Sequence, residues 1–62
     1  MHKYAVGAEV HDSPGIYEDK SARGLYRVVW LLPEEGNMPQ YRIKATVGGQ
    51  ERVAREEQLS PL

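Results

Sequence analysis

The sequence predicts a single all-β domain made of five short strands. Residues that break regular structure recur every eight to twelve positions along the 62-residue chain, a spacing typical of short antiparallel strands rather than long helices. Residues 41–47 alternate between apolar and polar side chains, which is the period of a strand with one buried face. The chain has no cysteine, so disulfides and thiolate metal sites are excluded.

Four strands are expected between the breaks, and a fifth short segment follows them. The four strands cover residues 9–12, 25–32, 40–47 and 50–55. Residues 55–59 are too few for an independent α-helix, so we expect one turn of 3₁₀ helix that brings Leu59 to the core. The polar stretch between the first two strands is expected to be a wide irregular loop.

The second expected strand has two candidate buried faces. One face carries Tyr26, Val28, Trp30 and Leu32. We expect this face to be buried, because burial of the other would take Arg27 out of water. Val29 and Leu31 are then partly exposed, unless a loop or terminus covers them or a β-bulge lets the strand use both faces.

The turn at Gly48 and Gly49 decides which face of the fourth strand is buried. A two-residue loop places Val53 on the charged face, opposite Lys44, whereas a three-residue loop places it opposite Ile43. Exposing a valine loses roughly 1–2 kcal/mol of burial. We therefore expect the three-residue loop and a buried Val53.

The order of these elements resembles that of an SH3-like small β-barrel. The segments that carry the resemblance are residues 6–10, 26–29, 41–44 and 51–59. Residues 32–36, 39–44 and 52–56 are also similar to those of very short bacterial proteins with a Tudor-like or SH3-like barrel. The resemblance implies one five-stranded SH3-like barrel over residues 1–62 and no particular activity, since small barrels bind many kinds of ligand.

The sequence departs from the SH3 domains that bind proline-rich peptides. The first loop offers only Tyr17 with two acidic residues, and the single tryptophan, Trp30, lies late in the second strand. No peptide-groove residues are therefore carried over. The candidate residues for binding a partner at the loop rim are Tyr17, Trp30 and Met38. Tyr26 and Tyr41 are expected in the core, because the chain has no phenylalanine.

The net charge of −1 hides an uneven distribution along the chain. Residues 1–19 carry −3, residues 20–55 carry +4 and the tail carries −2. Four cations are expected on the outer face of the central strands, namely Arg27, Arg42, Lys44 and Arg52. They form either a candidate patch for anions or nucleic acid, or an ordinary solubilising surface.

No catalytic residue, cofactor or metal site is expected. His11, Asp12 and Ser13 are consecutive, and neighbours on an extended chain point to alternate faces, so they cannot form a catalytic relay. His2 and His11 with Asp12 are a weak set of metal ligands. The longest apolar run, residues 28–32, is far shorter than the roughly 20 residues of a membrane span. No signal-peptide core is present, and a cytoplasmic location is expected.

The sequence thus predicts a non-catalytic interaction module that binds a protein or peptide through its loop rim. The alternative is single-stranded nucleic-acid binding through the basic outer face, with an aromatic ring stacked on a base. The chain is expected to be a monomer or a weak homodimer that pairs through Val29 and Leu31.

Overall fold

The structure is a computed structural model in which residues 1–12 and 24–62 are described. The expected first loop, with Tyr17, lies outside the described residues. The elements are β1 (Glu9–Asp12), β2 (Leu25–Glu35), β3 (Met38–Ala45), β4 (Glu51–Arg55), the 3₁₀ turn η2 (Glu56–Gln58) and β5 (Leu59–Pro61). The expected 3₁₀ turn is confirmed, and it delivers Leu59 to the core.

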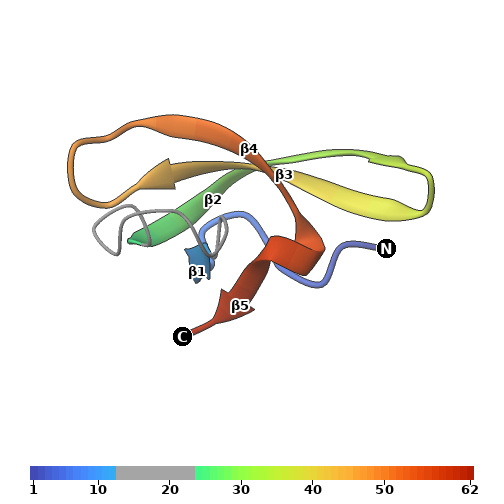
Figure 1. Cartoon of the computed structure of the whole chain (residues 1–62), viewed down its shortest axis with the longest axis horizontal. Coiled ribbons are helices and arrows are strands. Elements are labelled where there is room, and N and C mark those ends of the chain that lie inside the picture. The colour runs from blue at the N-terminus through green and yellow to red at the C-terminus, as the bar shows by residue number, and fades with distance from the viewer. Residues whose placement is uncertain (13–23) are drawn as a thin grey trace.

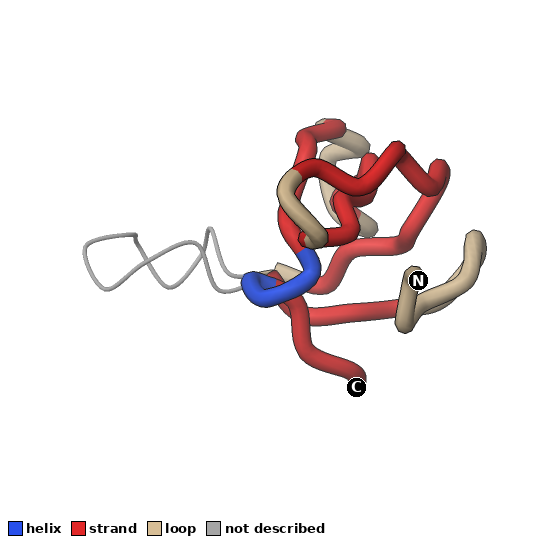
Figure 2. Tube along the Cα trace, turned by 90° about the vertical axis from the view of Figure 1, so that its right-hand side faces the viewer, coloured by secondary structure: helices blue, strands red, loops and turns tan. Residues whose placement is uncertain are grey.

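All strands belong to one antiparallel sheet in the order β4-β3-β2-β1-β5 (Figure 1). The sheet is strongly coiled when viewed from the side (Figure 2). The strands β4 and β5 lie at opposite edges and do not pair with each other, so the described strands do not close into a barrel. The expected all-β class is confirmed, and the expected barrel closure is not.

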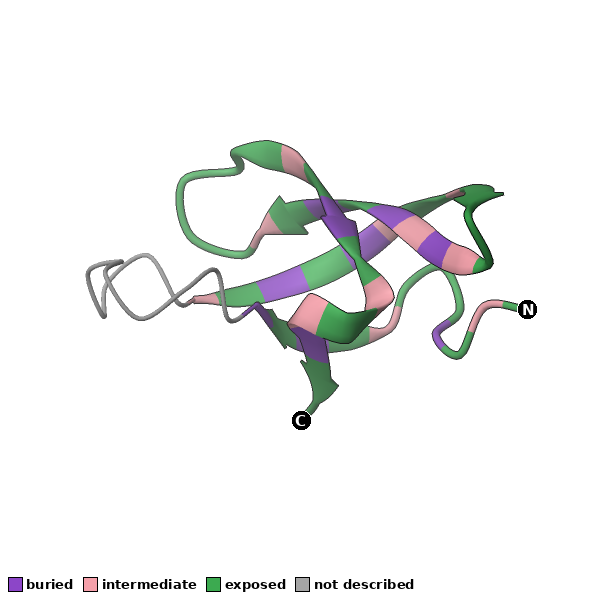
Figure 3. Ribbon diagram, turned by 45° about the vertical axis from the view of Figure 1, so that its right-hand side comes forward, coloured by how far each residue is buried: buried purple, intermediate pink, exposed green. Residues whose placement is uncertain are grey.

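The core lies on the inner face of the coiled sheet. Buried residues alternate with exposed ones along β1 and with intermediate or exposed ones along β3, as Figure 3 shows. The buried apolar residues are Tyr4, Val10, Tyr26, Val28, Tyr41, Ile43, Ala54 and Leu59. The expected burial of Tyr26 and Tyr41 is therefore confirmed.

The hairpin between β2 and β3 is longer and tighter than the sequence predicted. Both strands extend through a region expected to be a loop, and they are joined by Gly36 and Asn37 alone. These two residues have positive φ, 59° and 66°, as a two-residue turn of the primed type requires. Pro33 is tolerated in β2 because it falls inside a register shift, where the ladder of hydrogen bonds is interrupted.

The expected three-residue loop and buried Val53 are wrong. Ile43 pairs with Arg52, and Val53 lies opposite Arg42 on the outer face, 47% exposed. The N–H of Ala45 donates to the carbonyl of Gln50, which leaves residues 46–49 as a four-residue loop. In the core, the small side chain of Ala54 takes the place opposite the large ring of Tyr41.

Thr46, the first residue of this loop, continues the bonding of β3 to β2. Its N–H donates to the carbonyl of Leu25 on β2 at 3.0 Å, and its hydroxyl donates to the same oxygen at 3.2 Å. The turn back to β4 is made by Gly48 and Gly49, both with positive φ.

The N-terminal segment, which the sequence analysis left unassigned, packs on Tyr41. The Tyr41 hydroxyl donates to Glu56 Oε2 at 2.5 Å and accepts a hydrogen bond from the Tyr4 N–H at 3.0 Å. The N–H of Lys3 donates to the same Glu56 oxygen at 2.7 Å. The rings of His2 and Tyr4 meet the Tyr41 ring edge-on, with centroids 5.0 and 5.6 Å away.

His2 bonds the N-terminal segment to the β2–β3 hairpin. Its Nε2 lies 2.7 Å from the carbonyl oxygen of Leu32 and 3.1 Å from that of Gln40. Since both neighbours are acceptors, Nε2 carries the proton and donates to them. The N-terminal segment is thus tied to both strands of the β2–β3 hairpin.

These contacts change the acidity of two groups. The hydrogen bond from Tyr41, and then that from the Lys3 N–H, lowers the pKa of Glu56 below its ordinary value of 4.5. Burial, together with the hydrogen bond to Glu56, raises the pKa of Tyr41 above its ordinary value of 10.0.

The register of β4 predicts unequal costs for two equivalent truncations. Val28→Ala removes methyl groups from a fully buried site and should lower the free energy of unfolding by about 2 kcal/mol or more. Val53→Ala should lower it by less than about 1 kcal/mol, because Val53 is half-exposed. Denaturant unfolding of both variants measures the difference. Equal costs would contradict the four-residue loop.

The Glu56 contacts predict a pH dependence at the acid end. Because the folded state lowers the Glu56 pKa, the stabilisation is complete above pH 4.5 and is lost as the pH falls through the folded value. Tyr41→Phe removes the main cause, so it should raise the Glu56 pKa in an NMR titration. Glu56→Gln should flatten the acid decline of stability. Glu57→Gln, on the neighbouring exposed residue, is the control and should leave this decline in place.

Candidate functional site: the outer face of the sheet

A β-bulge in β2 places the only tryptophan of the chain on the outside. Val28 pairs with Ile43, but Trp30 pairs with Arg42, so Val29 is an extra residue in the strand. The bulge moves the side chains of Trp30, Leu31 and Leu32, which precede the next register shift, to the faces opposite those of a regular strand. Trp30 is 63% exposed as a result, and the expectation that it shares the buried face of Tyr26 and Val28 is wrong. The alternative with a bulge in this strand is the one the structure adopts.

Trp30 lies in the middle of the outer face of the sheet. Strand pairing sets its residues in two adjacent rows, one of which runs across β2, β3 and β4 as Trp30, Arg42 and Val53. The other runs across β1 to β4 as Glu9, Arg27, Lys44 and Glu51. We call these seven residues the outer-face patch. Val53 was not foreseen there, because its position depends on the length of the β3–β4 loop.

The two arginines of the patch are matched by carboxylates. Arg27 Nη2 lies 3.0 Å from Glu9 Oε2, and Arg42 Nη1 lies 3.6 Å from Glu51 Oε1. All four side chains are about half-exposed, so these ion pairs contribute little to stability. Within the described residues, Lys44 has no carboxylate within ion-pair distance, and it is the cation of the patch that remains available to a ligand.

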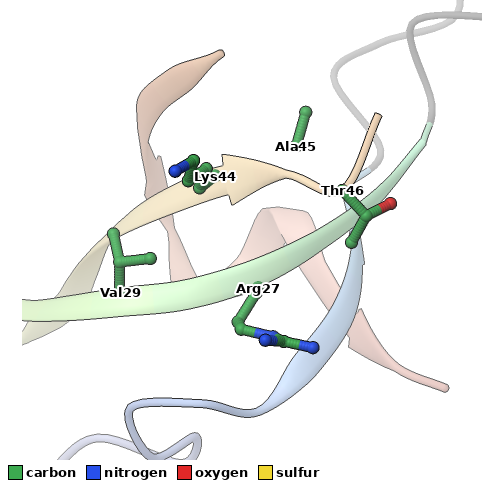
Figure 4. A pocket seen from close by; sticks show the side chains of 5 residues that line it. All are labelled: Arg27, Val29, Lys44, Ala45 and Thr46. Carbon is green, nitrogen blue, oxygen red and sulfur yellow. The ribbon is translucent and has the colours of Figure 1, made fainter. Parts of the chain in front are cut away.

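A shallow depression lies beside Lys44. Its volume is about 260 Å³, and it is lined by Arg27, Val29, Lys44, Ala45 and Thr46 (Figure 4). The lining comes from β2 on one side and from β3 and the residue that follows it on the other. The bulge residue Val29 supplies apolar surface, and the two cations supply positive charge. This composition fits an apolar group that carries a negative charge.

Arg52 does not belong to the basic face that the sequence predicted. It pairs with the buried Ile43, and its Nη1 reaches Asp12 Oδ2 at 3.0 Å. The Asp12 side chain is fully buried. The position opposite Ile43 follows from the four-residue loop, which reverses the faces of β4. Arg52 therefore serves to compensate a buried charge, while Arg27, Arg42 and Lys44 share the outer face as expected.

Two of the three candidate partner-binding residues, Trp30 and Met38, line different surfaces. Tyr17 lies outside the described residues. Met38 lines a separate depression of about 330 Å³ with Tyr4, Leu59 and residues of η2, whereas Trp30 belongs to the outer-face patch. Of the two that the structure describes, Trp30 is the one combined with the basic residues.

The consecutive polar residues near the end of β1 are divided between two environments. His11 is exposed and Asp12 is buried, in keeping with the alternation of a strand, and Ser13 lies outside the described residues. In the part of the chain that the structure describes, no three His, Asp or Glu residues gather as metal ligands. No helix in the same residues is long and apolar enough to cross a membrane.

Comparison with protein-family models, curated proteins and solved structures found no match to this chain.

The different surroundings of two arginines predict different effects of the same substitution. Arg52→Gln removes the ion pair between Arg52 and the buried Asp12 carboxylate and should lower the free energy of unfolding by about 2 kcal/mol or more. Arg42→Gln breaks an exposed pair and should lower it by less than about 1 kcal/mol. Urea unfolding of the two variants compares them directly. A larger loss of stability in Arg42→Gln than in Arg52→Gln would contradict the pairing of Arg52 with the buried Asp12.

Proposed function

We propose that this chain is a non-catalytic interaction module of SH3-like architecture that binds a protein or peptide partner. The strand order β4-β3-β2-β1-β5, with a 3₁₀ turn between the last two strands, supports the architecture. In place of the loop rim, the proposed binding surface is the outer-face patch around Trp30.

The observation that carries the proposal is the exposure of Trp30 next to Arg42 and Val53. Tryptophan and arginine are enriched among the residues that dominate protein interfaces, where they fill pockets of the partner. Burying the single tryptophan of the chain would stabilise a core of this size, yet the bulge in β2 directs the ring outward. Binding a partner recovers the lost burial.

The charges of the outer-face patch indicate which side chains a partner would carry. Arg27 and Arg42 already have carboxylates, so Lys44 and the depression next to it are the place for a new negative charge. The partner that fits best is a segment with a large apolar side chain for Trp30 and an acidic side chain for Lys44.

Single-stranded nucleic acid is the second candidate, because Trp30 shares its face with three cations. Such a ligand would stack a base on the indole ring and place phosphates along Arg27, Lys44 and Arg42. Glu9 and Glu51 border the same row and repel phosphates. The protein or peptide partner is favoured for this reason.

The proposal predicts that Trp30 dominates binding. The chain is used as bait in a native extract, and Trp30→Ala should weaken capture of the specific partner by roughly 30-fold, or about 2 kcal/mol. Leu62→Ala removes a similarly exposed apolar side chain outside the patch and should leave capture unchanged. Because Trp30 is the single tryptophan, its fluorescence should shift to the blue when the purified partner binds.

Titration with single-stranded RNA and DNA separates the two candidates. Nucleic-acid binding requires an affinity that falls with salt, by roughly 0.7 logarithmic units per phosphate contact for each tenfold increase in salt. It should also disappear in the double variant Arg42→Glu, Lys44→Glu. Salt-dependent binding that the double variant abolishes would favour nucleic acid over a protein as the ligand of the patch. A partner retained equally by Trp30→Ala and the control would refute the outer-face patch as the binding surface.

A further inference from the structure

The outer edge of β4 is the longer and less protected of the two open edges of the sheet. β4 has five residues and no proline, whereas β5 has three and ends at Pro61. Short length and proline both keep an edge strand from pairing with another chain. Among the described strands, none lies beyond β4 (Figures 1 and 3). The edge of β4 is therefore the more suitable one for pairing with a strand of another chain.

The backbone groups of β4 that face this edge follow from its pairing with β3. The N–H of Ala45 donates to the carbonyl of Gln50, so these residues form a hydrogen-bonded pair. Hydrogen-bonded pairs alternate with non-hydrogen-bonded ones along an antiparallel ladder. The N–H and C=O groups of Glu51 and Val53 therefore point away from β3. The Arg55 N–H, at the end of the strand, already donates to Gln58 Oε1 at 2.8 Å.

The side chains along the edge of β4 are complementary to those on the same edge of a second copy. Glu51, Val53 and Arg55 all lie on the outer face, where they pair with Lys44, Arg42 and Gln40 of β3. A two-fold axis through Val53 would align a second β4 antiparallel to the first. Each Glu51 would then lie opposite Arg55 of the other copy, and the two Val53 side chains would meet at the axis.

We propose that β4 pairs with β4 of a second copy of this chain, so that two sheets join into one continuous sheet. The two Val53 residues exchange backbone hydrogen bonds, and the Glu51 and Arg55 side chains fix the register. Glu51 and Val53 also belong to the outer-face patch, but the proposal does not depend on the function of that patch, because the pairing is made by backbone groups at the edge of β4. In this dimer, the row of Trp30, Arg42 and Val53 in one copy would continue across the two-fold axis into the same row of the other copy.

Charge reversal gives a test with a built-in rescue. Glu51→Arg gives both ends of β4 a positive charge, and Arg55→Glu gives both ends a negative charge. Each variant alone should dimerise at least about tenfold more weakly than the natural chain, because two attractive pairs become two repulsive ones. An equimolar mixture of the two variants should restore a mixed dimer. Sedimentation equilibrium and native mass spectrometry at high protein concentration measure both effects.

Controls separate the edge from charge and folding effects. Glu35→Arg changes the net charge as Glu51→Arg does, but it lies at the β2–β3 turn. Its mixture with Arg55→Glu has one attractive and one repulsive pair across the axis, so it should form much less mixed dimer than the mixture of Glu51→Arg with Arg55→Glu. Val53→Pro removes the outward N–H while leaving the ladder with β3 complete, and it should abolish dimerisation. Circular dichroism must show each variant folded.

Several results would overturn the proposal. The natural chain could stay monomeric at millimolar concentration, or its dimer could be unaffected by either charge reversal. Isotope-filtered NMR of the natural dimer needs no variant, and contacts between copies must centre on Val53. Contacts centred on Val29 and Leu31, or pairing of β4 only with an extended segment of another protein, would also refute it.

Discussion

The hydroxyl of Tyr41 joins three parts of the chain that are far apart in sequence. It lies on the central strand β3, donates to Glu56 in η2 and accepts from the backbone of Tyr4. A domain of 62 residues buries few side chains, so a buried tyrosine must satisfy its hydroxyl within the fold. Glu56 and the Tyr4 N–H do so, and they also fix η2 and the N-terminal segment against the core. The path of β5 depends on this contact, because η2 leads directly into it.

The bulge at Val29 lets one strand serve two purposes. Before it, Tyr26 and Val28 contribute to the core, and after it Trp30 faces outward while Leu31 lies opposite Tyr41. A regular strand would have to bury Trp30 in a core that Tyr4, Tyr26 and Tyr41 already fill. The extra residue removes this conflict and leaves an indole ring in the middle of an exposed sheet face. The structural requirement of the core and the proposed binding surface thus have one origin.

Charge is used differently on the two faces of the sheet. On the inner face, Arg52 compensates the buried Asp12, and the pair links β4 to the end of β1 although these strands are not neighbours in the sheet. On the outer face, Glu9 and Glu51 border Arg27 and Arg42 in water. Exposed pairs of this kind add little stability, but they narrow the set of ligands by opposing phosphates. This is the reason why the proposed partner is a protein segment and not a polyanion.

The sequence by itself determined which segments form strands, the 3₁₀ turn and the burial of Tyr26, Tyr41 and Leu59, because alternation and turn residues are local properties. It did not determine how far β2 and β3 extend into their hairpin. It left open, or predicted wrongly, the positions of Trp30, Val53 and Arg52. Each of these depends on one residue more or less in a bulge or a loop, and such a shift turns every later side chain to the other face. Only the tertiary structure decided these shifts, because their physical cause is contact between distant segments. Thr46 is bonded to Leu25 of β2, and the four-residue loop that it opens places Ala54 in the core opposite Tyr41 and turns Val53 to the outer face.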